Sequence, residues 1–238
     1  MKMKEIPTPT PEIIKEHLNM WDTSEDAQKY PAQEKALNFL FSTACPLHDD
    51  MTHIILKVSA LNDFYSTNIF DTYSVAQRIL SIRDFKERVE NGDHSLVNEL
   101  AQVSIKGKTI NFYSFASKYC SHHCPRQFPI YDSYVEKMLL HYNKHSKFMP
   151  FKKSDLKVYE HFLSAIKSFQ QTYGLENFSL RDIDIFLWQA GKEYFPKSYG
   201  KKKVKDTAFI QSKDKAGRIS GQFKKYLITK LNRNSGDV

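Results

Sequence analysis

The tract Phe128-Pro129-Ile130-Tyr131-Asp132 places an acidic side chain directly before an amphipathic segment that runs to Leu140. A proline-stiffened apolar stretch followed by an aspartate at the mouth of a helix holds one carboxylate at a fixed position. Such a carboxylate can stabilise a developing cation or activate a water molecule. Aspartate is also a favoured N-cap, and Ser133 with Glu136 forms an alternative capping box for the same helix. The residues alone support both a catalytic and a capping interpretation of Asp132.

The segments that must position this tract have the apolar periodicity of helices, so we predict an all-α fold. Residues 95–105 are predicted as a helix, and residues 105–109 as a basic turn that contains Gly107. The aromatic run 110–120 suits either a strand or a helix. We predict a helix there, because no neighbouring segment alternates clearly enough to be a partner strand. A broad apolar stripe comprises Ile54, Ile55, Val58, Leu61 and Tyr65. Two further helices are predicted to begin at side-chain caps, one at Asp71 or Thr72 and one at Ser179.

Composition restricts the class of partner. The chain has 238 residues, 41% of them hydrophobic, which is enough for one core or two modest lobes. Its 35 Lys and Arg against 27 Asp and Glu give a formal charge of +8, which favours a polyanion such as nucleic acid. Three cysteines are too few for a disulfide scaffold, and neither an apolar signal segment nor a membrane-length apolar run is evident. We therefore expect a cytoplasmic protein.

The segment Ser114–Val135 resembles the core of the helix-hairpin-helix (HhH-GPD) DNA glycosylases, particularly the adenine-mismatch and endonuclease-III-like branch. In that family a hairpin feeds a helix, and a loop then leads to F-P-I-x-D-x-x-V, whose aspartate is catalytic. Residues 128–135 have this order, and the 18 positions from Ser114 to Asp132 equal the family spacing. The resemblance implies two helical lobes around a DNA-binding cleft, with Asp132 as the catalytic residue.

This sequence also departs from the family pattern at positions that change the expected chemistry. Ser114 stands where bifunctional members place a Schiff-base lysine, and serine cannot form that adduct, so a monofunctional enzyme is implied. Lys118, one helical turn later, either reaches toward the pocket or faces solvent or phosphate. The expected hairpin glycines are missing before Ser114, so the phosphate-gripping hairpin is either degenerate or displaced to residues 106–109. No cysteine follows Cys124, so no iron–sulfur cluster, and no other cofactor, is expected.

Further candidate residues follow from the place of each segment in the resemblance. Residues 61–68 occupy the position where relatives carry groups that enter the duplex, although a buried aromatic helix end is an equal alternative. The basic run 197–205 is interpreted as a phosphate grip or as a solvated charged loop. The candidates for the base pocket are Asn62, Tyr65 and Tyr131. The candidates for DNA binding are Lys106, Lys108, Thr109, His122, His123, Lys201, Lys202 and Lys203.

The tract Cys120-Ser-His-His-Cys124 has ligand spacing compatible with structural zinc, and Cys45 and His48 could be distant ligands. It falls, however, at a helix end that the resemblance already explains. We therefore predict no metal at this position.

The preferred interpretation is a monofunctional DNA glycosylase that hydrolyses the N-glycosidic bond of a damaged or modified base, in DNA repair or in defence against phage DNA with bulky modified bases. The rivals are a catalytically inactive DNA-binding or regulatory protein, and a metal-dependent nuclease that uses Cys120, His122 and Cys124. We expect a monomer that binds double-stranded DNA and no membrane. The predicted divisions are N-terminal helices that join the second lobe (1–50), the catalytic core (51–142), packing helices (143–196) and a basic segment (197–238).

Overall fold

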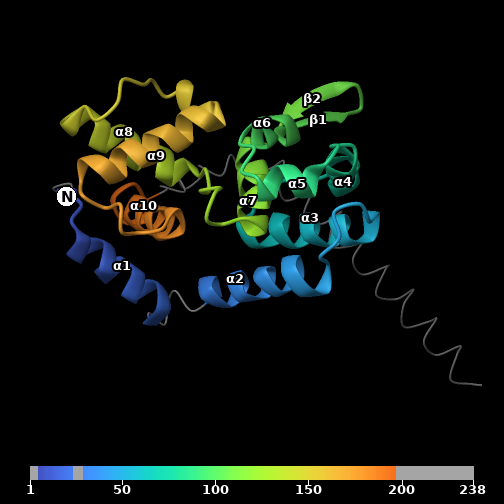
Figure 1. Ribbon diagram of the computed structural model, residues 1–238, viewed down its shortest axis with the longest axis horizontal. Coiled ribbons are helices and arrows are strands. Elements are labelled where there is room, and N and C mark those ends of the chain that lie inside the picture. The colour runs from blue at the N-terminus through green and yellow to red at the C-terminus, as the bar shows by residue number, and fades with distance from the viewer. Residues whose placement is uncertain (1–4, 24–28, 197–238) are drawn as a thin grey trace, which may run out of the picture. The chain divides into compact units, whose positions relative to one another are not determined.

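The computed structural model describes residues 5–23 and 29–196, which belong to one compact unit (Figure 1). The predicted basic segment, with Lys201, Lys202 and Lys203, lies outside the described residues. Within them the chain is mostly helical, as predicted, and contains no helix long and apolar enough to span a membrane. The helices and strands are α1 (Pro11–Thr23), α2 (Lys29–Phe39), a π-helical turn (Leu40–Ala44), α3 (Met51–Tyr65), α4 (Thr72–Leu80), α5 (Phe85–Glu90), α6 (Ser95–Ala101), β1 (Gln102–Ile105), β2 (Lys108–Asn111), α7 (Tyr113–His123), α8 (Ser133–Ser146), a 3₁₀ turn (Asp155–Lys157), α9 (Tyr159–Thr172) and α10 (Leu180–Tyr194).

Several helices begin at a side chain that caps them. The Asp50 carboxylate accepts a 3.0 Å hydrogen bond from the His53 backbone N–H at the start of α3. Asp71 accepts one of the same length from Ser74 at the start of α4. Ser179 and Asp182 form a reciprocal capping box on α10. Of the two caps predicted for α4, Asp71 and Thr72, the structure has Asp71, and the predicted cap Ser179 is confirmed, because these caps depend only on local sequence.

The structure corrects the purely helical prediction between residues 102 and 111. There β1 and β2 form an antiparallel hairpin that pairs Val103 with Ile110 and Ile105 with Lys108. Its two-residue turn has positive φ at both Lys106 (50°) and Gly107 (75°), which matches the right-handed twist of a short hairpin. The predicted helix 95–105 therefore ends at Ala101, and the helix predicted over 110–120 begins at Tyr113.

The helices group by their packing. α10 packs against α8 and α1, whereas α3 packs against α4 and α7, and α6 packs against α7 and α9 (Figure 1). α8 and α10 approach each other at Gly191, where an added Cβ would lie 2.6 Å from Tyr134 Cβ and 3.0 Å from the Tyr134 carbonyl oxygen. Glycine is needed there because no other residue leaves room for the neighbouring helix. This close crossing fixes the N-terminal end of α8, where Asp132 lies.

Candidate functional site

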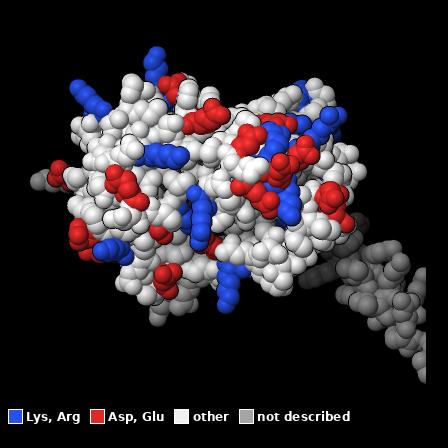
Figure 2. Space-filling view, in the orientation of Figure 1, with Lys and Arg blue, Asp and Glu red and all other residues white. Residues whose placement is uncertain are grey.

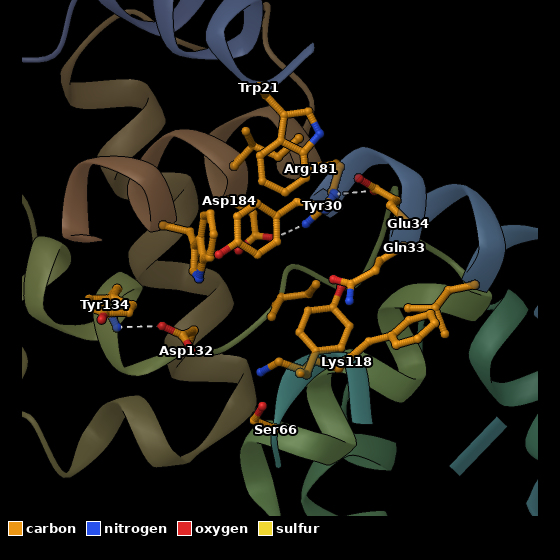
Figure 3. A pocket seen from close by; sticks show the side chains of 16 residues that line it. Trp21, Tyr30, Gln33, Glu34, Ser66, Lys118, Asp132, Tyr134, Arg181 and Asp184 are labelled. Carbon is orange, nitrogen blue, oxygen red and sulfur yellow. Dashed lines mark hydrogen bonds and ion pairs between the residues drawn. The ribbon is translucent and has the colours of Figure 1, made fainter. Parts of the chain in front are cut away.

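A cavity of about 220 Å³ brings together side chains from the two ends and the middle of the described chain (Figure 3). Its walls come from α1, α2, α3, α7, the start of α8 and α10. Charged and aromatic groups dominate this lining. The charged residues are Glu34, Lys118, Asp132, Arg181 and Asp184, and the aromatic residues are Trp21, Tyr30, Phe64, Tyr65, Tyr134 and Trp188.

Asp132 caps α8 and also faces the cavity. Its carboxylate accepts a 2.7 Å hydrogen bond from the Tyr134 backbone N–H, which makes it the N-cap of α8, and it also lines the cavity (Figure 3). The alternative capping box does not form. Glu136 is buried instead, where it accepts a hydrogen bond from the Tyr131 hydroxyl and pairs with Lys153 at 3.1 Å. Asp132 is therefore a half-buried carboxylate held at a fixed position.

Lys118 points into this site from α7, and its side chain is only 3% exposed. Its Nζ donates to Ser114 Oγ (2.7 Å), to the Ser114 carbonyl oxygen (3.2 Å) and to the Tyr131 carbonyl oxygen (3.3 Å). The Ser114 hydroxyl in turn donates to the Tyr131 carbonyl oxygen (3.1 Å). Burial lowers the pKa of Lys118, while Asp132 and Asp184 oppose that shift. Because these three partners are acceptors, the hydrogen bonds favour the charged ammonium.

A second carboxylate in the cavity, Asp184 on α10, was not found from the sequence. It is 3% exposed and accepts a 2.5 Å hydrogen bond from Arg181, whose Nε also donates to Glu34 at 2.9 Å (Figure 3). Burial raises the pKa of Asp184 to about 7, and Arg181 and Lys118 oppose that rise. The signal in the sequence was an acid between Ile183 and Ile185 in an apolar run, since a charge within a buried stripe needs a partner.

One wall of the cavity is an aromatic cluster that joins α1, α2 and α10. The ring of Trp21 stacks on that of Tyr30 with centroids 5.9 Å apart, and Trp188 meets Tyr30 edge-on at 4.9 Å. Lys192 fixes this cluster from the outside, because its Nζ donates to the Tyr30 hydroxyl at 3.0 Å and lies 4.4 Å from the Trp188 ring centroid. Aromatic surfaces of this kind can stack on a planar ligand.

The predicted pocket residue Tyr65 lines the cavity and is linked to His122. Its hydroxyl lies 3.0 Å from His122 Nε2, and the Lys118 ammonium lies 5.2 Å from its ring centroid. Burial raises the pKa of Tyr65 and lowers that of His122 to about 3, so both side chains are neutral at physiological pH. His122 also lines a second cavity of about 330 Å³, which shares Glu34, Ile130 and Arg181 with the first.

Other predicted site residues lie elsewhere. The Asn62 side-chain amide bonds the Ile69 backbone and Thr67, and so organises the loop after α3. The Tyr131 hydroxyl bonds Glu136, away from the cavity. The His123 ring packs 4.4 Å from His48 and 4.8 Å from Phe41 in a buried cluster. Neither Asn62, Tyr131 nor His123 lines the first cavity.

The predicted DNA-binding residues of the hairpin, Lys106, Lys108 and Thr109, are all exposed at its turn and on β2. Figure 2 shows that on the face in view Lys and Arg are interspersed with Asp and Glu. Charged side chains of the described residues also form ion pairs, such as Arg88 with Asp93 at 2.7 Å and with Glu99 at 2.8 Å. The face in view therefore carries both positive and negative side chains. The hairpin adds the exposed basic side chains of Lys106 and Lys108.

No three His, Cys, Asp or Glu residues lie close enough to hold a metal ion within the part of the chain that the structure describes. Cys120 is fully buried, and this burial raises the pKa of its thiol, which disfavours the thiolate that binds zinc. The tract from Cys120 to Cys124 therefore forms the last turn of α7 and its C-cap.

Comparison with known proteins places the chain in a family. The family model HI_0787_N, described as an N-terminal domain, matches residues 13–127. An uncharacterized protein of Haemophilus influenzae is 50% identical over 145 residues, which cover 61% of this chain and 69% of that protein. The chain therefore belongs to the family of this Haemophilus influenzae protein. No solved structure matches the chain. The HI_0787_N match includes Lys118 but ends before Asp132. It therefore covers the lining residues from α1, α2, α3 and α7 but not those from α8 and α10.

Proposed function

We propose that this protein is a monofunctional DNA glycosylase of the helix-hairpin-helix type, which hydrolyses the N-glycosidic bond of a damaged or modified base. The observation that carries the proposal is the position of Asp132. It is a carboxylate fixed by its own helix cap, and it lines an aromatic cavity beside the buried Lys118. The sequence resemblance around residues 114–135 points to the same aspartate independently of the cavity.

In the proposed reaction the target nucleotide leaves the helical stack and its base enters the cavity. The C1′–N bond breaks with its electron pair on the base, and positive charge develops on the sugar. The Asp132 carboxylate stabilises this charge in a partly desolvated site, where electrostatic interactions are stronger than in water. A water oxygen then bonds to C1′, and its proton passes through Asp132 to the departing base. An abasic site remains.

The hydrogen bonds of Lys118 support hydrolysis by water over attack by an amine. An amine must be neutral to attack C1′, whereas the Lys118 nitrogen donates to three oxygen acceptors. Its ammonium holds the Tyr131 carbonyl, one residue before Asp132, against α7. We therefore assign Lys118 as a positioning residue that orients the loop of Asp132.

The cavity walls suit a modified base. The Trp21, Tyr30 and Trp188 rings offer stacking surfaces, and Asp184 offers an acceptor for an exocyclic N–H group. The second cavity shares part of its wall with the first and has polar lining residues, including Asn38 and Ser121. A bulky substituent on the base would find room there. This space suits the bulky modified bases of phage DNA, and the smaller bases produced by DNA damage would fit in the first cavity.

The test is direct detection of the released base. The purified protein is incubated with genomic DNA, with alkylated or oxidised DNA, and with phage DNA that carries modified cytosines, each in parallel with and without EDTA. Released bases are identified by mass spectrometry, and abasic sites are revealed by cleavage in hot alkali. We expect a free base from at least one substrate and no strand scission before the alkali step.

The outcomes separate the rival functions. DNA binding without base release from any substrate would establish the inactive DNA-binding protein and overturn the glycosylase. Activity that EDTA abolishes would instead favour the metal-dependent nuclease. The matched control is Asp132→Asn, which preserves the helix cap and is expected to reduce base release at least about a hundredfold.

A further inference from the structure

The second cavity contains polar side chains that the first cavity does not use. It has a volume of about 330 Å³ and adjoins the first cavity along three shared lining residues, Glu34, Ile130 and Arg181. Figure 3 shows Arg181 between Glu34 and Asp184, which accept its hydrogen bonds. Side chains that already have partners hold the walls together. The side chains without partners therefore indicate what a ligand would supply.

Three side chains that line the second cavity have no hydrogen bond or ion pair within the described residues. They are Asn38 on α2, Ser121 on α7 and Arg126 on the turn after α7. Ser121 is only 3% exposed, so the cavity is where its hydroxyl can find a partner. A buried hydroxyl without a partner destabilises the protein, which favours a bound polar group at this position.

The turn that carries Arg126 is fixed in place. The Gln127 backbone N–H donates to the Cys124 carbonyl oxygen (3.0 Å), and the Gln127 side-chain amide donates to the Glu90 carbonyl oxygen (2.8 Å). His94 Nε2 lies 3.1 Å from the Gln127 carbonyl oxygen. An ordered backbone thus holds Arg126 at the cavity, and its guanidinium carries five N–H donors.

The charges that line the second cavity are not balanced. The lining has two cations, Arg126 and Arg181, and one carboxylate, Glu34, which lies 2.9 Å from Arg181 Nε. His122 is neutral, because burial lowers its pKa to about 3. Arg181 is paired with Glu34 and with Asp184 of the first cavity, so the positive charge without a counter-charge is that of Arg126.

We propose that the second cavity binds a carboxylate or phosphate group at the end of a substituent on the base that occupies the first cavity. This assignment rests on the proposed function and names its substrate class, a base with an anionic substituent. A guanidinium donates two parallel hydrogen bonds to a carboxylate or a phosphate, and hydrogen bonds between charged groups are stronger than those between neutral ones. The Ser121 hydroxyl and the Asn38 amide supply further donors for the same group.

The experiment measures binding to three DNA duplexes that differ at one cytosine. The first duplex has an unmodified cytosine, the second has a short alkyl chain on C5 that ends in a carboxylate, and the third has the same chain ending in the neutral amide. The wild-type protein is compared with Arg126→Met, Arg126→Lys and Ser121→Ala. Arg83→Met is the matched control, because Arg83 is exposed and has no partner within the described residues but lines neither cavity. Base release is measured in parallel with the same preparations.

We expect the wild type and Arg83→Met to bind the carboxylate duplex about tenfold more tightly than the amide duplex, the effect of one charge-assisted contact. Arg126→Met should bind these two duplexes equally. Arg126→Lys should keep part of the preference, because lysine has the charge without the planar fork. Ser121→Ala should reduce the preference about threefold, through the loss of one hydrogen bond. Binding to the unmodified duplex should be the same for all variants.

Equal binding of the carboxylate and amide duplexes by the wild type would overturn the anion site, and so would a preference that Arg126→Met retains. If Arg126→Met weakens binding to all three duplexes alike, Arg126 contacts the DNA backbone and the assignment fails. Inorganic phosphate is the probe for a free anion. If it raises the thermal stability of the wild type but not of Arg126→Met, and no duplex is preferred, the cavity takes a free anion and the assignment also fails. A wild type that prefers the carboxylate duplex but releases no base supports the anion site and refutes the glycosylase.

Discussion

Lys118 Nζ lies 2.7 Å from Ser114 Oγ, one turn earlier on α7, and both side chains donate to the same acceptor, the Tyr131 carbonyl oxygen. Serine occupies the position at which the resemblance to DNA glycosylases would place a reactive lysine. The lysine of the next turn directs its ammonium back to that position and is held there by acceptors. The two residues together connect α7 to the loop that ends in Asp132.

Substitution at Asp132 can separate its capping role from its chemical role. Asparagine is as good an N-cap as aspartate, so we expect Asp132→Asn to change the unfolding free energy little and to reduce base release at least about a hundredfold. Asp132→Ala should lose the same activity and also about 1 kcal/mol of stability. The measurements are base release and urea denaturation. The control is Asp50→Asn on the cap of α3, which should keep full activity. Equal activity of Asp132→Asn and wild type would refute the catalytic role.

Lys118 is expected to form no covalent adduct with DNA. The wild-type protein, incubated with abasic DNA and sodium borohydride, should give no trapped complex on a denaturing gel, because its ammonium is not nucleophilic. Lys118→Met removes donors to three acceptors and should destabilise the protein by about 1–3 kcal/mol. Lys167→Met, at an exposed position on α9, is the control and should have an effect below about 0.5 kcal/mol. A trapped adduct that disappears in Lys118→Met would contradict hydrolysis by water.

Asp184 should give the stability a particular pH dependence. Its pKa is about 7 in the folded protein because of burial, against 3.8 for an unperturbed aspartate. Between these values the folded protein retains a proton that the unfolded chain has lost, so the contribution of Asp184 is complete below about pH 4 and declines as the pH rises to 7. The difference in unfolding free energy between wild type and Asp184→Asn should therefore decrease over this range and level off above it. Urea titrations at several pH values measure it. A difference independent of pH would mean that Arg181 keeps Asp184 ionised throughout.

Gly191→Ala should destabilise the protein even though alanine is intrinsically the better helix former by about 1 kcal/mol. The added methyl would meet Tyr134 on α8, and overpacking of this kind costs about 1–3 kcal/mol. Because the N-terminal end of α8 carries Asp132, base release should also fall without loss of any group that touches DNA. Thermal unfolding and base release are the two measurements. A rise in the unfolding temperature with full activity would show that the helix crossing is not needed to position Asp132.

Local signals in the sequence predicted the parts of the fold that depend on neighbouring residues. The N-caps Asp71 and Ser179 were predicted because a side chain and a backbone N–H three positions apart are sufficient to form them. The hairpin was missed, although its turn was predicted, because Val103 is the only fully buried residue of its two strands. A four-residue strand with one buried side chain has too little alternation to be recognised.

The far wall of the cavity had no local signal. Trp21 and Trp188 are 167 positions apart in the sequence but only 5.7 Å apart between ring centroids, and only tertiary packing brings them together. Tyr131 was proposed for the pocket on the basis of its place beside Asp132. Its neighbour Ile130 lines the cavity instead, whereas the Tyr131 hydroxyl bonds Glu136.

The Glu34–Arg181 ion pair joins residues 147 positions apart, near opposite ends of the described chain. Closing so long a loop costs conformational entropy. The contacts of α2 and α10 offset this cost only when both helices are packed in place. Local opening of either helix would break this ion pair and remove a wall of the cavity. Amide hydrogen exchange of α2 and α10 thus measures how often this wall of the cavity opens, independently of global unfolding.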